Sequence, residues 1–143
     1  CFRLYAVSRL VIQAYHPYLE PLGITYPQYL ILMLLWEQDN QLVNHIAHQL
    51  CLETNTVTPL IQRMEKEGLV RRRKGEADRR QTVVSLTRKG LLLEEQAKDV
   101  PTCLSDSIAM RGIQPEEMIS LIAPLDHLIQ ALGRQDDPTH TSR

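Results

Sequence analysis

The sequence of 143 residues has no long apolar run and no basic, apolar leader at its start. A helix that spans a bilayer needs roughly 20 consecutive apolar residues, and a secretory leader has its own recognisable pattern. We therefore expect a cytoplasmic protein that does not associate with membranes.

Cysteine and aromatic residues are also scarce. The three cysteines are an odd and small number, unlike the framework of a secreted disulfide-rich protein. All seven aromatic residues lie within the first 36 positions, so the basic segment that follows has none. Because RNA and single-stranded DNA are commonly bound by base stacking on aromatic rings, double-stranded DNA is the better partner for that segment.

A glycine-rich phosphate loop and a complete set of metal ligands are absent from the sequence as well. His45, His48 and Cys51 have the spacing H-x-x-H-x-x-C, but a zinc site needs four converging ligands and no fourth is evident. We interpret the two histidines as exposed helix residues and Cys51 as a small packed side chain. No metal or cofactor is expected.

Charge is present but unevenly distributed. Residues 63–89 contain ten Lys and Arg against four Asp and Glu, whereas the rest of the chain contains six against thirteen. The formal net charge of −1 therefore conceals a polarised molecule. Most charge runs are only solvated surface, but a patch this concentrated fits the neutralisation of DNA phosphates.

Residues 53–87 carry the pattern that organises the chain. Apolar residues recur at the spacing i, i+3, i+4, i+7 of one helix face, at Val57, Leu60, Ile61 and Met64. Thr54 or Asn55 is expected to cap this helix, and Gly68 to end it. A strand from Val70, a basic turn and a second strand over residues 82–86 complete a predicted winged helix-turn-helix. Leu42 and Val43 are expected to form a one-rung strand beside the wing.

Polar side chains on the open face of this helix and on the hairpin are candidates for contacts with base edges and phosphates. The candidates are Thr54, Asn55, Thr56, Thr58, Gln62 and Arg63 on the helix, Arg72, Lys74, Arg79 and Arg80 on the hairpin, with Asp78 holding the hairpin, and Arg88 after it.

The flanking segments are helical and more apolar than this core requires. We predict a mainly α protein with a small β-hairpin wing, a single domain over residues 1–132 whose DNA-binding part covers about 39–90. Residues 1–20 and 91–132 are expected to form dimerisation helices, and residues 133–143 a disordered tail. A homodimer would present two recognition helices to palindromic DNA.

The wing carries a recognisable signature. Asp78-Arg79-Arg80, followed by VVSLT at 83–87 and by Gly90, resembles the wing of the MarR family of dimeric transcription regulators. The resemblance implies that Asp78 pairs with a basic neighbour and that Arg80 or Arg72 enters the minor groove.

Two further segments are similar to one branch of that family, the organic hydroperoxide resistance regulators (OhrR). They are CFRLYAVSR at the start of the sequence and AYHPYLEPLGITYPQYLILMLLWE after it. The resemblance implies that Cys1 senses the peroxide and that Tyr5, Tyr15 and Tyr26 line its pocket. It also implies that Cys103 is a possible resolving cysteine.

The chemistry is consistent with this resemblance. A thiolate that attacks a hydroperoxide needs a lowered pKa, which a helix N-terminus and tyrosine hydroxyl donors favour. We therefore predict a repressor that releases its operator when an organic hydroperoxide oxidises Cys1. The alternative is a MarR-type regulator that responds to a small phenolic or apolar ligand.

Two other classes are less consistent with the sequence. A thiol peroxidase is disfavoured because the chain lacks a thioredoxin-like strand pattern, so we expect no enzyme. A winged helix used only for protein contacts would leave the concentrated basic patch unexplained.

Overall fold

The computed structural model describes residues 1–133. The chain divides into two compact units, residues 1–101 and residues 102–143. The tail predicted for residues 133–143 lies, apart from its first residue, outside the described part. None of the helices in that part is long and apolar enough to cross a membrane.

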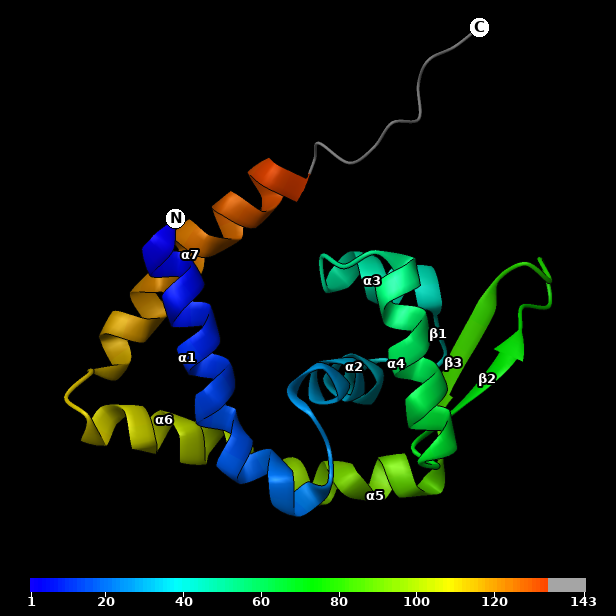
Figure 1. Cartoon of the computed structure of the whole chain (residues 1–143), viewed down its shortest axis with the longest axis horizontal. Helices are drawn as coiled ribbons and strands as arrows, with labels where there is room; N and C mark the ends of the chain where they lie inside the picture. The colour runs from blue at the N-terminus through cyan, green and yellow to red at the C-terminus, as the bar shows by residue number, and fades with distance from the viewer. Residues whose placement is uncertain (134–143) are drawn as a thin grey trace, which may run out of the picture. The chain divides into compact units, whose positions relative to one another are not determined.

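The predicted winged helix-turn-helix is confirmed in the first unit (Figure 1). Its elements are α1 (Phe2–Leu19), the 3-10 turn η1 (Glu20–Leu22), α2 (Tyr26–Glu37), β1 (Gln41–Leu42), α3 (Val43–Gln49), α4 (Thr54–Lys66), β2 (Val70–Lys74), β3 (Thr82–Leu86) and α5 (Arg88–Ala97). Helix α6 (Val100–Met110) crosses the boundary between the units, and α7 (Pro115–Gly133) follows it.

Helix α2 is the central helix of the first unit. Thr25 and Gln28 form a capping box at its start: the Gln28 N–H donates to Thr25 Oγ1, and the Thr25 N–H donates to Gln28 Oε1 at 3.1 Å. Ile31, Leu32 and Leu35 on this helix are almost completely buried. A helix that is apolar nearly all round is buried in this way because no face of it gains from contact with water.

The three strands form an antiparallel sheet in the order β1-β3-β2. The short strand β1 pairs through Gln41 and Leu42, one residue earlier than predicted. In β2, Arg72 lies opposite the fully buried Val84. Because side chains alternate along a strand, Arg72 faces the helices and its neighbours Arg71 and Arg73 lie on the other face.

Both ends of α4 are defined by backbone geometry. The predicted cap at Thr54 or Asn55 is wrong, since Glu53 is the N-cap and Thr54 is the first helical residue. At the other end, the Leu69 N–H donates to the Met64 carbonyl at 2.9 Å, and Gly68 has a φ of 78°. Gly68 therefore ends the helix as predicted, and glycine adopts this left-handed conformation without steric strain because it has no Cβ.

Helix α5 begins against the end of α4. The hydroxyl of Thr87 accepts from the Gly90 N–H at 3.2 Å, so Thr87 caps this helix. The Thr87 N–H donates to the Leu69 carbonyl at 3.1 Å, and the Trp36 indole donates to the Gly90 carbonyl at 2.9 Å. Three helices and the wing therefore meet at one backbone junction.

Apolar side chains are exposed at both ends of the chain. On α1 they are Phe2, Leu4, Tyr5, Val7, Leu10 and Ile12, and on α7 they are Met118, Ile119, Leu121, Ile122, Leu125, Leu128, Ile129 and Leu132. Exposed apolar area of this extent usually marks an interaction surface.

The first prediction concerns Gly90. A Cβ at this position would overlap the carbonyl oxygen of Leu69, which is backbone and cannot move aside. Gly90→Ala should therefore lower the free energy of unfolding by at least about 2 kcal/mol, measured by denaturant titration. Gly133→Ala, where a Cβ meets nothing within 4 Å, is the control. Equal stability of the two variants would contradict the crowded junction.

Candidate nucleic-acid interface

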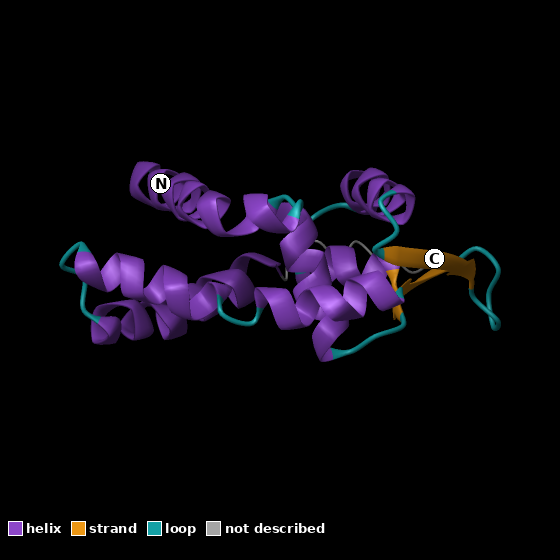
Figure 2. Cartoon of the chain, turned by 90° about the horizontal axis from the view of Figure 1, so that it is seen from below, coloured by secondary structure: helices purple, strands orange, loops and turns teal. Residues whose placement is uncertain are grey.

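The open face of α4 and the hairpin form one polar surface. Every candidate residue on α4 is exposed except Thr58, which is partly buried, and those on the hairpin are exposed too. The apolar side chains Val57, Ile61 and Met64 on the opposite face of α4 are completely buried. Figure 2 shows the two long strands and their connecting loop extending beyond the helices of the first unit. A helix with one free polar face beside a projecting basic hairpin suits the grooves of duplex DNA.

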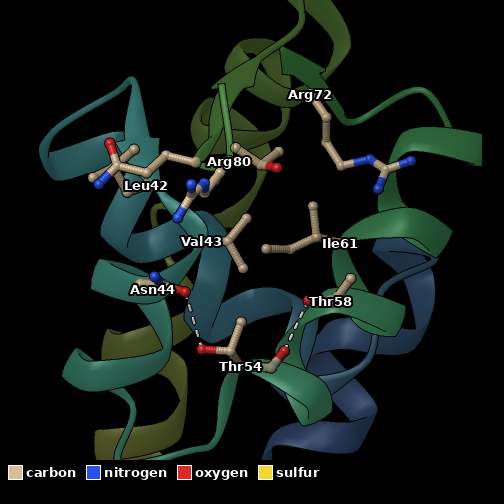
Figure 3. A pocket seen from close by; sticks show the side chains of 10 residues that line it. Leu42, Val43, Asn44, Thr54, Thr58, Ile61, Arg72 and Arg80 are labelled. Atoms are coloured by element: carbon tan, nitrogen blue, oxygen red, sulfur yellow. Dashed lines mark hydrogen bonds between the residues drawn. The ribbon is translucent and has the colours of Figure 1, made fainter. Parts of the chain in front are cut away.

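Side-chain bonds fix the first turn of α4. The Thr54 hydroxyl donates to Asn44 Oδ1 of α3 at 3.1 Å, and the Thr58 hydroxyl donates to the Thr54 carbonyl at 2.8 Å (Figure 3). The contact with Asn44 explains why Thr54 does not cap its own helix, because its hydroxyl is used to join α3 to α4. Asn55 and Gln62 remain exposed on the same helix.

The hairpin turn is held by Asp78, but not as predicted. Its carboxylate accepts from the Arg80 backbone N–H at 2.9 Å, so the expected pairing with a basic side chain is replaced by a turn of the backbone. The Gly75 N–H also donates to the Gln81 carbonyl at 2.9 Å. The Arg80 side chain is therefore presented by a well-bonded turn.

Arg80 and Arg72 point in different directions. Figure 3 shows Arg80 extending over a pocket toward Leu42 and Val43, while Arg72 extends to the other side. Arg72 is bound to Glu65 of α4, with its Nη2 at 3.0 Å from Glu65 Oε1. The hydrogen bonds from the Arg72 side chain and backbone hold the pKa of the Glu65 carboxyl below its usual range. The Glu65 carboxyl is therefore ionised at neutral pH.

Other candidates keep open side chains. Arg79 and Lys74 are exposed on the hairpin, and Arg88 is exposed at the start of α5. Arg63 lies 3.4 Å from Glu67 but keeps 70% of its side chain accessible. Thr56 is exposed in the first turn of α4.

Sequence reasoning missed Arg71 and Arg73, which are exposed on the outer face of β2. The alternation of side chains along a strand was the available signal, because it separates these two residues from Arg72. It also missed Asn44, whose role depends on a contact between two helices.

Cys1 and the predicted tyrosines lie in two places in the first unit. Cys1 is exposed and is the N-cap of α1, one helical turn from the exposed Tyr5. The ring of Tyr15 lies 5.1 Å from that of Tyr26 and 5.7 Å from that of Tyr29, measured between centroids. Tyr29, which the sequence did not single out, therefore belongs to the same tyrosine cluster.

The tyrosine cluster is partly removed from water. Burial raises the pKa of Tyr15, Tyr26 and Tyr29, and the neighbouring hydroxyls raise that of Tyr15 further. These hydroxyls are therefore protonated at neutral pH and able to donate hydrogen bonds.

Cys1 and the tyrosine cluster cannot meet within one chain. Cys1 caps α1 and Tyr15 lies near its other end, and a helix rises by about 1.5 Å per residue, which places their backbones roughly 20 Å apart. Cys103, the predicted resolving residue, is exposed on α6.

The histidines near the turn of the helix-turn-helix take no metal-like arrangement. His45 Nε2 lies 2.9 Å from Gln49 Nε2 on the same helix. Within residues 1–133, no group of three or more potential metal ligands converges.

The comparisons with known proteins agree with this geometry. Residues 24–82 match the model of the MarR family. The chain is 40% identical over 136 residues to the organic hydroperoxide resistance transcriptional regulator of Bacillus subtilis, with 95% of this chain and 90% of that protein covered.

Two solved structures extend the likeness. Reduced AbfR bound to DNA has a TM-score of 0.76 and 34% identity, with 92% of this chain and 89% of that chain covered. Disulfide-formed AbfR has a TM-score of 0.65 and 38% identity, with 90% and 88% covered; AbfR comes from Staphylococcus epidermidis. With a winged helix, a free polar recognition face and relatives of this similarity, the chain belongs to the MarR family of DNA-binding transcriptional regulators.

Proposed function

We propose that this regulator is a homodimeric repressor that releases palindromic operator DNA when an organic hydroperoxide oxidises Cys1. The observation that carries the proposal is the exposed thiol of Cys1, one helical turn from Tyr5, in a chain 40% identical to an organic hydroperoxide resistance regulator. The same relative favours oxidation over a small phenolic or apolar ligand as the signal. Such a regulator would act in the cytoplasm, where its operator DNA lies.

The proposed reaction begins with the Cys1 thiolate. It attacks the distal oxygen of the hydroperoxide, and the O–O bond breaks, so that Cys1 becomes a sulfenic acid. The alkoxide that leaves takes up a proton and becomes an alcohol.

A second chain would complete the sensing site. Since Cys1 and Tyr15 lie near opposite ends of α1, the tyrosine cluster that serves one Cys1 must come from the partner in a two-fold pair. Protonated tyrosine hydroxyls would then donate to the thiolate, and the aromatic rings around them would favour an organic peroxide. Tyr5, one turn from Cys1, would come from the same chain as the thiol.

The exposed apolar residues of α1 and α7 supply the surface for such a dimer. Each Å² of this apolar surface that a partner covers makes the free energy of association more favourable by roughly 25 cal/mol. Family members are dimers, which supports the same assembly here.

Cys103 is the proposed resolving residue. Its thiol would displace water from the sulfenic acid of Cys1 on the partner chain and leave an intersubunit disulfide. The solved disulfide form of AbfR shows that a relative 38% identical to this chain forms a disulfide. We favour this outcome over a mixed disulfide with a small thiol.

The central prediction tests Cys1. Cys1→Ser should bind operator DNA like the wild type but remain bound after treatment with an organic hydroperoxide, because serine cannot form a sulfenic acid. Fluorescence anisotropy with labelled duplex measures both properties. Cys51→Ser is the control and should still release DNA; Cys51 is exposed, not packed as the sequence suggested.

Release of DNA by Cys1→Ser on peroxide treatment would refute the sensor assignment. Intact-mass analysis of oxidised wild-type protein tests Cys103 separately. Monomeric adducts without a covalent dimer would remove its proposed role and leave that of Cys1 in place.

The dimer prediction is tested by sedimentation. The wild-type chain should sediment as a dimer, and Ile122→Glu combined with Ile129→Glu should weaken it, because both apolar side chains are exposed on one face of α7. Ser120→Glu adds charge to the same helix as a control. A wild-type chain that stays monomeric at micromolar concentration would contradict the dimer.

The DNA contacts are tested by salt dependence. Arg80→Ala should weaken operator binding and reduce the slope of log K against log salt by about one unit if Arg80 neutralises a phosphate. Asn55→Ala and Gln62→Ala should instead change the preferred sequence, because such side chains read base edges. An unchanged affinity and slope for Arg80→Ala would place the hairpin outside the interface.

A further inference from the structure

Glu65 is an unexpected residue on the recognition helix. It is the one acidic residue among the 13 of α4, and it lies within the most basic segment of the chain. A carboxylate on a surface that binds phosphate would weaken binding through charge repulsion. Its presence there calls for a compensating role.

The contacts of Glu65 supply that role. The Arg72 backbone N–H donates to Glu65 Oε2 at 2.9 Å, while Arg72 Nε and Nη2 donate to Oε1 at 3.2 and 3.0 Å. Both carboxylate oxygens are therefore used, and the backbone as well as the side chain of Arg72 is held. Such charge-assisted, multiple contacts constrain geometry more than a single ion pair does.

The strand register directs Arg72 toward α4. Arg72 lies opposite the buried Val84, on the face of β2 that packs toward the helices. The Arg72 side chain is 31% exposed and its guanidinium is bound to Glu65, whereas Arg80 extends over the pocket toward Leu42 and Val43 (Figure 3).

This pair is a specific link between the two DNA-reading elements. Among residues 1–133, the side-chain hydrogen bonds that join α4 to the hairpin β2–β3 are the ones between Glu65 and Arg72. The end of α4 is instead joined to other helices, since Gln28 of α2 donates to Glu67 at 3.2 Å and Lys89 of α5 donates to the Glu67 carbonyl at 2.9 Å.

We propose that Glu65 and Arg72 form a clasp that fixes the angle between the recognition helix and the wing, and that Arg72 is a positioning residue rather than a DNA contact. The inference rests on DNA binding by α4 and the hairpin. With the clasp closed, Arg80 and the polar face of α4 are held at one fixed separation before DNA is met. Without the clasp, this separation must be fixed during binding, and the entropy lost in fixing it lowers the affinity for a correctly spaced site.

The clasp and simple electrostatics predict opposite effects for Glu65→Gln. Removing a negative charge from a DNA-binding surface should strengthen binding if charge alone matters. Loss of the clasp should instead weaken specific binding about fivefold, the equivalent of an ion pair of about 1 kcal/mol. Glu76→Gln removes an exposed acid from the hairpin turn without touching the clasp and is the matched control.

Arg72 provides a second comparison. Arg72→Ala and Arg72→Lys should both weaken specific binding about fivefold, because lysine keeps the charge but cannot reproduce the two-nitrogen contact. The salt slope should stay that of the wild type. Arg73→Ala, which removes a charge from the other face of the same strand, is the control for charge alone.

The experiment is an anisotropy titration over a range of salt concentrations, with duplexes selected by the wild-type protein from a random pool. The double variant Glu65→Gln with Arg72→Ala should bind no more weakly than either single variant, because the two residues act as one unit. Thermal unfolding of each variant separates loss of the clasp from loss of the fold. The clasp predicts weaker specific binding in variants that keep the wild-type unfolding temperature within a few degrees.

Three results would overturn the clasp: binding by Glu65→Gln as tight as that of Glu76→Gln, a salt slope reduced by about one unit in Arg72→Ala, or weakening that follows the unfolding temperature alone. Failure of the wild-type protein to select any duplex would instead refute DNA binding by this surface. The redox proposal is independent of these measurements, since none of them uses peroxide.

Discussion

The backbone of Leu69 is the point on which the DNA-binding unit depends. Its N–H ends the recognition helix by donating to the Met64 carbonyl, and its carbonyl accepts from the Thr87 N–H that begins α5. Gly90 packs directly on the same carbonyl, so close that no Cβ fits. Because the backbone of this one residue joins the two helices, the orientation of α4 is tied to the orientation of α5.

Electrostatics reinforce that junction at the end of α4. Carbonyl groups at a helix C-terminus carry partial negative charge, and Lys89 donates to one of them, that of Glu67. A basic residue in the first turn of α5 therefore opposes the dipole of its own helix but complements that of α4. The basic segment serves the fold in this way as well as offering charge to phosphate.

The tyrosine cluster is connected to the same junction through Trp36. Tyr15 contacts Tyr29, whose ring lies 6.2 Å from that of Trp36, and Trp36 donates to the Gly90 carbonyl. A change at the proposed sensing site would alter DNA affinity only if it stabilised one arrangement of these contacts over another. The path from Tyr15 to α5 is short and passes through rigid aromatic side chains.

The sequence by itself determined the elements and the family. Apolar spacing located the buried face of α4, and Gly68 was read correctly as its end because a helix ending depends on residues within one turn. The tertiary structure alone decided the partners of Thr54, Arg72 and Asp78, since each choice depends on which polar group another segment or turn brings within reach. It also separated Cys1 from Tyr15, because residues that share a helix are held apart by its length.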